Sequence, residues 1–176
     1  MSGTKIPRNE IREGATQNVD IEKEGKMEGG VMSLGGGRGG VYVWKAIWEN
    51  KYYIMGSYIV KDTNVIDYSI PMLGNIDNTP YPEIVFITNG SLHYMYALKF
   101  DPAMAAGSQV ALKWNVPHTD GSGCTGATLF DFDQDKKNEI VYRDQTQLRI
   151  FDGDGQVLPG ALFNNVISGT IREYPV

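Results

Sequence analysis

The sequence predicts an all-β fold, and three observations support this prediction. Beyond residue 40, the chain consists of short runs rich in β-branched and aromatic side chains, separated by turn-forming residues. No window keeps a helical hydrophobic period for more than about two turns. A loop followed by a strand occurs twice with the same residue pattern, which indicates a repeat architecture.

In chain order, residues 1–40 are expected to form a flexible arm, because they are charged, rich in glycine and poor in periodic apolar residues. Residues 41–176 are expected to form the folded part. Residues 41–48 and 52–55 read as a hairpin with its turn at 49–51. Further strands are predicted at residues 83–87, 92–98, 110–114, 128–130, 139–142, 147–151 and 156–158.

The composition limits the function classes. The chain has 176 residues, of which 41% are hydrophobic and 21% charged, as in a globular domain with a core. A net charge of -5 argues against a nucleic-acid-binding protein, which normally carries a basic face. The single cysteine, Cys124, excludes an internal disulfide framework, and no run of residues approaches the length of a membrane span.

The repeated unit aligns residues 75–86 with residues 131–142. Both copies begin with an acidic or amide residue, an apolar residue and an aspartate, and both end in Glu-Ile-Val; Glu83 and Glu139 are 56 positions apart. Residues 169–176 resemble residues 67–72, the strand that leads into the first loop. We therefore expect the chain to stop where another repeat begins.

The second loop predicts a metal site. Oxygen donors stand at alternating positions, and this spacing lets one loop wrap a hard cation; calcium, which takes six to eight oxygens in a flexible shell, suits it better than magnesium. Position 6, where such loops usually have glycine, is Lys136. The predicted ligands are the side chains of Asp131, Asp133, Asp135 and Glu139 and the backbone carbonyl of Lys137.

The first loop is a weaker candidate. It keeps the donor positions with only two carboxylates, and Pro80 at position 6 cannot take a left-handed conformation. The alternative is a corner held by packing and hydrogen bonds without a metal. The candidate ligands are Asn75, Asp77, Thr79, the carbonyl of Tyr81, and Glu83.

Other motifs favour ordinary structural roles. Residues 152–155 read Asp-Gly-Asp-Gly and are predicted to form a hairpin turn rather than a cation loop. The glycine-rich residues 35–40 lack the features of a phosphate loop and are expected to be a linker. His93, His118 and Cys124 have no neighbouring residues that would make them metal ligands or catalytic groups.

These residues carry a resemblance to a known family. Residues 70–86 and 127–151 resemble FG-GAP/VCBS repeats, as found in integrin-α-like β-propellers, and residues 142–150 are similar to repeats of Bacteroidetes-type cell-surface proteins. With incomplete units at both ends, the resemblance covers about residues 41–176. It implies propeller blades that are four-stranded antiparallel sheets, loops that bind Ca²⁺, and export to the cell surface.

A propeller needs about four to eight blades, and this chain holds about two complete repeats. We therefore expect an incomplete propeller segment that belongs to a larger surface protein or completes its ring with a partner chain. The expected function is non-catalytic: an extracellular calcium-binding module for adhesion or for binding a protein or glycan. The alternatives are the non-catalytic propeller portion of a polysaccharide-degrading enzyme and a structural subunit of a surface filament.

Overall fold

The computed structural model describes residues 16–19, 29–33, 40–48, 51–60, 71–88, 93–105, 107–121 and 126–164. Within these ranges the chain forms β-strands and no helix, which confirms the all-β prediction. No helix of this part of the chain has the length and apolarity to cross a membrane. The strands are β1 (Thr16–Val19), β2 (Gly29–Ser33), β3 (Gly40–Trp48), β4 (Lys51–Ile59), β5 (Met72–Gly74), β6 (Glu83–Ile87), β7 (Tyr94–Phe100), β8 (Val110–Pro117), β9 (Ala127–Phe130), β10 (Glu139–Arg143), β11 (Gln147–Phe151) and β12 (Val157–Asn164).

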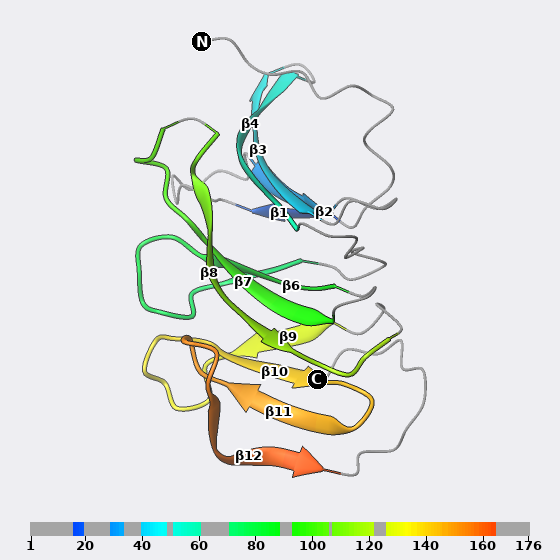
Figure 1. Cartoon of the computed structure of the whole chain (residues 1–176). Coiled ribbons are helices and arrows are strands. Elements are labelled where there is room, and N and C mark those ends of the chain that lie inside the picture. Colours follow the sequence, from blue (N-terminus) through cyan, green and yellow to red (C-terminus); the bar gives the residue numbers. More distant parts are fainter. Residues whose placement is uncertain are drawn as a thin grey trace.

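The strands form three four-stranded antiparallel sheets, β1–β4, β5–β8 and β9–β12. In each sheet every strand pairs with its neighbour in sequence, so each sheet is a simple meander. Figure 1 shows the three sheets following one another from one end of the molecule to the other. Sheets of this kind are consistent with propeller blades.

The first sheet includes part of the chain expected to be an arm. β1 and β2 lie within residues 1–40, and β2 pairs with β3 from Gly29↔Lys45 to Ser33↔Val41. Backbone hydrogen bonds to β3 therefore hold a stretch whose side-chain composition gave no strand signal. The rest of residues 1–40 lies outside the described residues, and its flexibility stays a prediction.

The second sheet packs against a neighbouring sheet on each face, because alternate residues of a strand point to opposite sides. From β6, Ile84 and Phe86 pack with Val41 and Val43 of the first sheet. The intervening Val85 and Ile87 pack against the third sheet, in a cluster that also contains Ile140, Tyr142 and Phe151. All five residues of β6 are buried, and each large side chain buried in this way contributes about 1.5–3 kcal/mol.

Several strands that hold equivalent places in neighbouring sheets contact one another. The first strands contact one another, β1 with β5 and β5 with β9, and the last strand of the first sheet, β4, contacts β8. The second and third sheets therefore present equivalent strands at equivalent places. Glu83 opens β6 and Glu139 opens β10, so the two predicted loops lie at the same corner of successive sheets, between the first and second strands.

The predicted hairpin turn at residues 152–155 is present between β11 and β12. The Gly155 amide donates to the carbonyl of Asp152 over 3.1 Å, and the Asp152 amide donates to the carbonyl of Gln156 over 2.9 Å. Gly155 has a φ of 78°, which glycine adopts without steric cost. The turn packs against the second sheet, where the Trp114 indole N–H donates to the carbonyl of Gly153 over 2.9 Å.

Candidate metal centre

Three predicted ligands of the second loop come together in the structure. The loop joins β9 to β10, and one carboxylate oxygen from each of Asp131, Asp133 and Glu139 lies within 4.8 Å of the others. Glu139 is buried, Asp131 is partly exposed and Asp133 is exposed. Such a group can hold a metal ion, because two oxygens on opposite sides of an ion at about 2.4 Å are about 4.8 Å apart.

Hydrogen bonds within the loop fix these carboxylates. The Phe132 amide donates to Oε2 of Glu139 over 2.8 Å. The Asp135 amide donates to Oδ1 of both Asp131 and Asp133, each over 3.1 Å. The three carboxylates are thus oriented by the backbone of the loop itself.

The loop backbone takes the sharp turn without glycine. Lys136, at position 6, has a φ of 73°, and Gln134, at position 4, has a φ of 64°. A residue with a side chain pays about 1–2 kcal/mol for this conformation. The Lys136 amide donates to Oδ2 of Asp131 over 3.0 Å, which partly offsets that cost by satisfying a carboxylate oxygen.

Asp135 does not belong to the group of three. Its Oδ1 accepts a hydrogen bond from the Lys137 amide over 2.8 Å, and its Oδ2 lies 3.0 Å from the Lys137 ammonium. The Lys137 side chain, and then its amide, hold the pKa of the Asp135 carboxyl below its ordinary value. The ligand roles predicted for Asp135 and for the Lys137 carbonyl stay predictions.

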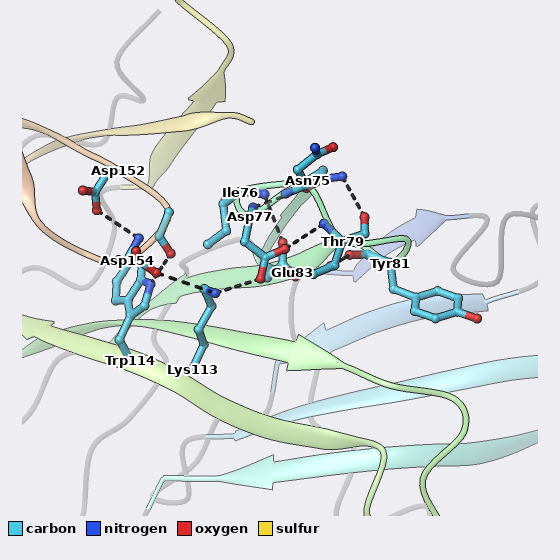
Figure 2. A network of polar contacts seen from close by, with 12 residues as sticks. Asn75, Ile76, Asp77, Thr79, Tyr81, Glu83, Lys113, Trp114, Asp152 and Asp154 are labelled. Atoms are coloured by element: carbon cyan, nitrogen blue, oxygen red, sulfur yellow. Dashed lines mark hydrogen bonds and ion pairs between the residues drawn. The ribbon is translucent and has the colours of Figure 1, made fainter. Parts of the chain in front are cut away.

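The first loop repeats the hydrogen-bond pattern of the second. The Ile76 amide donates to Oε2 of Glu83 over 3.0 Å, and the Thr79 amide donates to Oδ1 of Asp77 over 3.0 Å. Asn78, at position 4, has a φ of 62°. With proline at position 6, the second left-handed residue of the other loop has no counterpart here. Figure 2 shows this loop and the residues around it.

The side chain of Lys113, from β8, places a positive charge beside the first loop. The Lys113 ammonium lies 2.8 Å from Oδ2 of Asp77 and 4.0 Å from Oδ1 of Asp154 (Figure 2). Partial burial alone would raise the pKa of Asp77, but the hydrogen bonds from Lys113 and Thr79 outweigh it and lower the pKa. For Glu83 burial is the larger effect and raises the pKa, although the Ile76 amide opposes it.

Sequence reasoning missed Lys113, which lies on β8, 36 residues from Asp77. A lysine in a predicted strand gives no signal of a loop contact, because only the pairing of β8 with β7 brings it there. Sequence reasoning also missed Asn138, whose amide and side chain both donate to the carbonyl of Asn75, over 2.7 and 3.0 Å. These bonds join the two loops directly.

His118 lies in a polar cluster between the second and third sheets. Its Nε2 lies 3.0 Å from the carbonyl of Thr88, and its Nδ1 accepts the Asp120 amide over 3.1 Å. Because Nδ1 accepts, the proton of the neutral ring is on Nε2. Burial is the main cause that lowers the pKa of His118 to about 4, against the opposing effect of Asp120. His93 stacks on the ring at 5.6 Å, and Cys124 lies outside the described residues.

The chain thus belongs to the class of all-β proteins made of successive four-stranded sheets, with a carboxylate loop that can hold a metal ion. No protein-family model matches it, and none of the curated proteins matches it. Among solved structures, it is similar to the V. cholerae biofilm matrix protein Bap1, with 17% sequence identity and a TM-score of 0.36. The match covers 82% of this chain and 19% of that protein.

Proposed function

We propose that this chain is a non-catalytic, calcium-stabilised β-sheet module of an extracellular surface protein, built from FG-GAP/VCBS-like repeats. The observation that carries the proposal is the convergence of Asp131, Asp133 and Glu139 at the corner between β9 and β10. All three donors are carboxylate oxygens, which hard cations prefer. They lie on an irregular loop, which suits the flexible shell of calcium better than the strict octahedron of magnesium.

The role proposed for the ion is structural. Three carboxylates within 4.8 Å repel one another, and an ion that neutralises them stabilises the folded loop over the unfolded one. Asp135 and the carbonyl of Lys137 complete the proposed ligand set. Calcium modules outside the cell work at weak affinities, about 10⁻⁴–10⁻³ M, which suits a site whose Asp133 is exposed.

Calcium is expected to raise the melting temperature of the wild-type protein by about 5–10 °C when its concentration is about 100 times the dissociation constant. Asp133→Asn removes one of the three converging negative charges, so it is expected to abolish most of this rise. The variant keeps a side-chain oxygen that can accept the Asp135 amide, so the hydrogen bond within the loop is retained. Thermal unfolding with calcium and with EGTA measures both. Asp154→Asn is the matched control, because that carboxylate is exposed and belongs to the turn after β11. A well-folded wild-type protein that shows no calcium response would contradict the proposal.

An exposed aromatic pair beside the loop supports a partner on the outward face of the third sheet. Ile76, at position 2 of the first loop, is fully buried against that sheet. The equivalent residue of the second loop, Phe132, is 54% exposed, and Phe130 is 57% exposed; their rings lie 4.9 Å apart. We infer that a further four-stranded sheet, from the rest of the surface protein or a partner chain, covers this face as the third sheet covers the second.

Without that further sheet, the isolated chain is expected to associate weakly through this face at high concentration. Phe132→Ser is expected to reduce the association and to leave the melting temperature nearly unchanged, because the side chain is half exposed. Sedimentation velocity over a range of concentrations measures the effect. Met104→Ser is the control, because Met104 is equally exposed (53%) but far along the chain from this face. Association unaffected by Phe132→Ser would rule this face out.

A further inference from the structure

A lysine and an aspartate from distant parts of the chain meet in a shielded place beside the first loop. The Lys113 ammonium, on β8, lies 2.8 Å from Oδ2 of Asp77, 36 residues away. Only 19% and 20% of the two side chains are exposed. By comparison, the pair of Lys137 with Asp135, at 3.0 Å, lies within one loop and has about twice the exposure on both side chains. Water therefore has limited access to the contact between Lys113 and Asp77.

The Asp77 carboxyl is oriented so that the lysine nitrogen can attack its carbon. Its Oδ1 accepts the Thr79 amide over 3.0 Å, and its Oδ2 faces the Lys113 nitrogen. When a nucleophile adds to a carboxyl carbon, negative charge develops on an oxygen, and a backbone amide that donates to this oxygen stabilises the charge. The Thr79 amide is in place to do this at Oδ1, and Oδ2 is then the oxygen that leaves.

A third group, the Glu83 carboxyl, is buried beside this pair. Glu83 is 1% exposed, and its Oε1 accepts the Thr79 hydroxyl over 3.2 Å, so that Thr79 links it to Asp77 (Figure 2). Its Oε2 accepts the Ile76 amide over 3.0 Å, which fixes the carboxyl. Burial raises the pKa of Glu83, and the charges of Asp77 and Lys113 also act on it, which places the three groups close together. A carboxyl in this position can take a proton from one group and deliver it to another.

We propose that Lys113 and Asp77 condense in the folded protein to form an isopeptide bond, which is an amide between the two side chains. The Lys113 nitrogen forms a bond to Cγ of Asp77, and the bond between Cγ and Oδ2 breaks. Oδ2 leaves as water with two of the three ammonium protons, which Glu83 moves from the nitrogen to the oxygen. The third proton stays on the amide nitrogen. No group is oxidised or reduced, and no further reactant is needed.

The fold favours this condensation, although the same side chains do not condense when they are free in water. Two groups held in a productive orientation can react as if they were present at about 10⁵–10⁸ M, and exclusion of water slows the reverse reaction, hydrolysis. The bond joins the fourth strand of the second sheet to the loop between its first two strands. Because the chain has a single cysteine, this amide supplies a covalent cross-link that no disulfide within the chain can supply. The proposal depends neither on a metal ion nor on an extracellular location.

The mass of the intact wild-type protein, measured after denaturation, tests the proposal directly. We expect it to be lower by one water than the mass calculated from the sequence. Fragmentation of a protease digest is expected to show a peptide containing Lys113 joined to one containing Asp77. A succinimide at an Asp-Gly sequence such as Asp152-Gly153 would give the same intact mass but no joined peptides. An unmodified mass, or a loss of water located at another place, would overturn the proposal.

Lys113→Arg keeps a positive charge beside Asp77, but it is expected to show its full calculated mass, because a guanidinium stays charged and does not attack a carboxyl. In EGTA this variant is expected to melt roughly 10 °C below the wild type, as after the loss of a covalent cross-link. Lys99→Arg is the matched control, because Lys99 is an exposed lysine beside the same loop. It is expected to keep the loss of one water, and the full mass in this control would contradict the assignment to Lys113.

The role of Glu83 is tested by two substitutions. Glu83→Gln keeps an oxygen for the Ile76 amide but cannot carry a proton, so it is expected to lose most of the cross-link. Glu83→Asp keeps a carboxyl and is expected to restore part of it. Circular dichroism shows whether each variant is folded, and the mass of the wild type decides the proposal if neither is. Cross-linking of folded Glu83→Gln at the wild-type rate would overturn the role given to Glu83.

Discussion

Replacing Gly153 with alanine is expected to lower the free energy of unfolding by about 3 kcal/mol or more. A Cβ atom at this position would lie 1.8 Å from the carbonyl oxygen of Ile76 and 2.8 Å from its carbonyl carbon. Both atoms belong to the backbone of the first loop, which cannot rotate away as a side chain would. The turn of the third sheet must therefore move off the second sheet, and the hydrogen bond from Trp114 to the carbonyl of Gly153 is lost with it.

Urea unfolding followed by circular dichroism measures this effect, which corresponds to a melting temperature lower by about 6–12 °C. Gly121→Ala is the matched control, because the nearest atoms to a Cβ there are at 3.6 and 3.9 Å, which is ordinary contact. Equal stabilities of the two variants would show that the turn and the first loop do not pack as closely as the structure places them.

Acidification from pH 7 to pH 4 is expected to remove about 3 kcal/mol of stability through His118 alone. The pKa of His118 is about 4 in the folded protein, against 6.5 for an ordinary histidine. Between these two values the unfolded chain binds a proton that the folded chain does not. Stability is therefore complete above pH 6.5 and falls steadily as the pH drops toward 4.

The structure explains why the His118 ring stays neutral in the folded protein over this pH range. The added hydrogen would be on Nδ1, which already accepts the Asp120 amide, so two donors would face each other in a buried site. Asp120 and Asp144 favour the charged ring, and His93 opposes it, but burial outweighs them all. His118→Gln removes the titration, and its free energy of unfolding is expected to change less between pH 7 and pH 4. Identical pH profiles for the two proteins would contradict this account.

Much of the fold could be predicted from the sequence, because its signals are local. β6 and β10 follow loops of the same pattern, and their β-branched and apolar residues are themselves enough to mark them as strands. β1 and β2 could not be predicted in this way, since their strand conformation depends on pairing with β3 and not on their own side chains. The stacking order of the sheets likewise depends on contacts between distant residues, such as Ile76 with the third sheet.

Part of the candidate site could also be predicted from the sequence. Alternating acidic residues indicated Asp131, Asp133 and Glu139, and the structure brings these three together. Asp135 also had the right spacing, but Lys137, two residues further along, pairs with it. Lys113 had no signal in the sequence, because its role depends on the register of β8 against β7.

The meander connectivity of the sheets has a consequence for how the protein folds. Each strand pairs with its sequence neighbour, so the contacts within a sheet close short segments of chain and form early at little entropic cost. The contacts between sheets, including the Gly153 turn against Ile76, can form only after both sheets exist. We therefore expect folding to proceed by growth of the sheets followed by their docking. The first and third sheets are each docked on one face only among the described residues, so they are expected to open before the second when the native protein fluctuates.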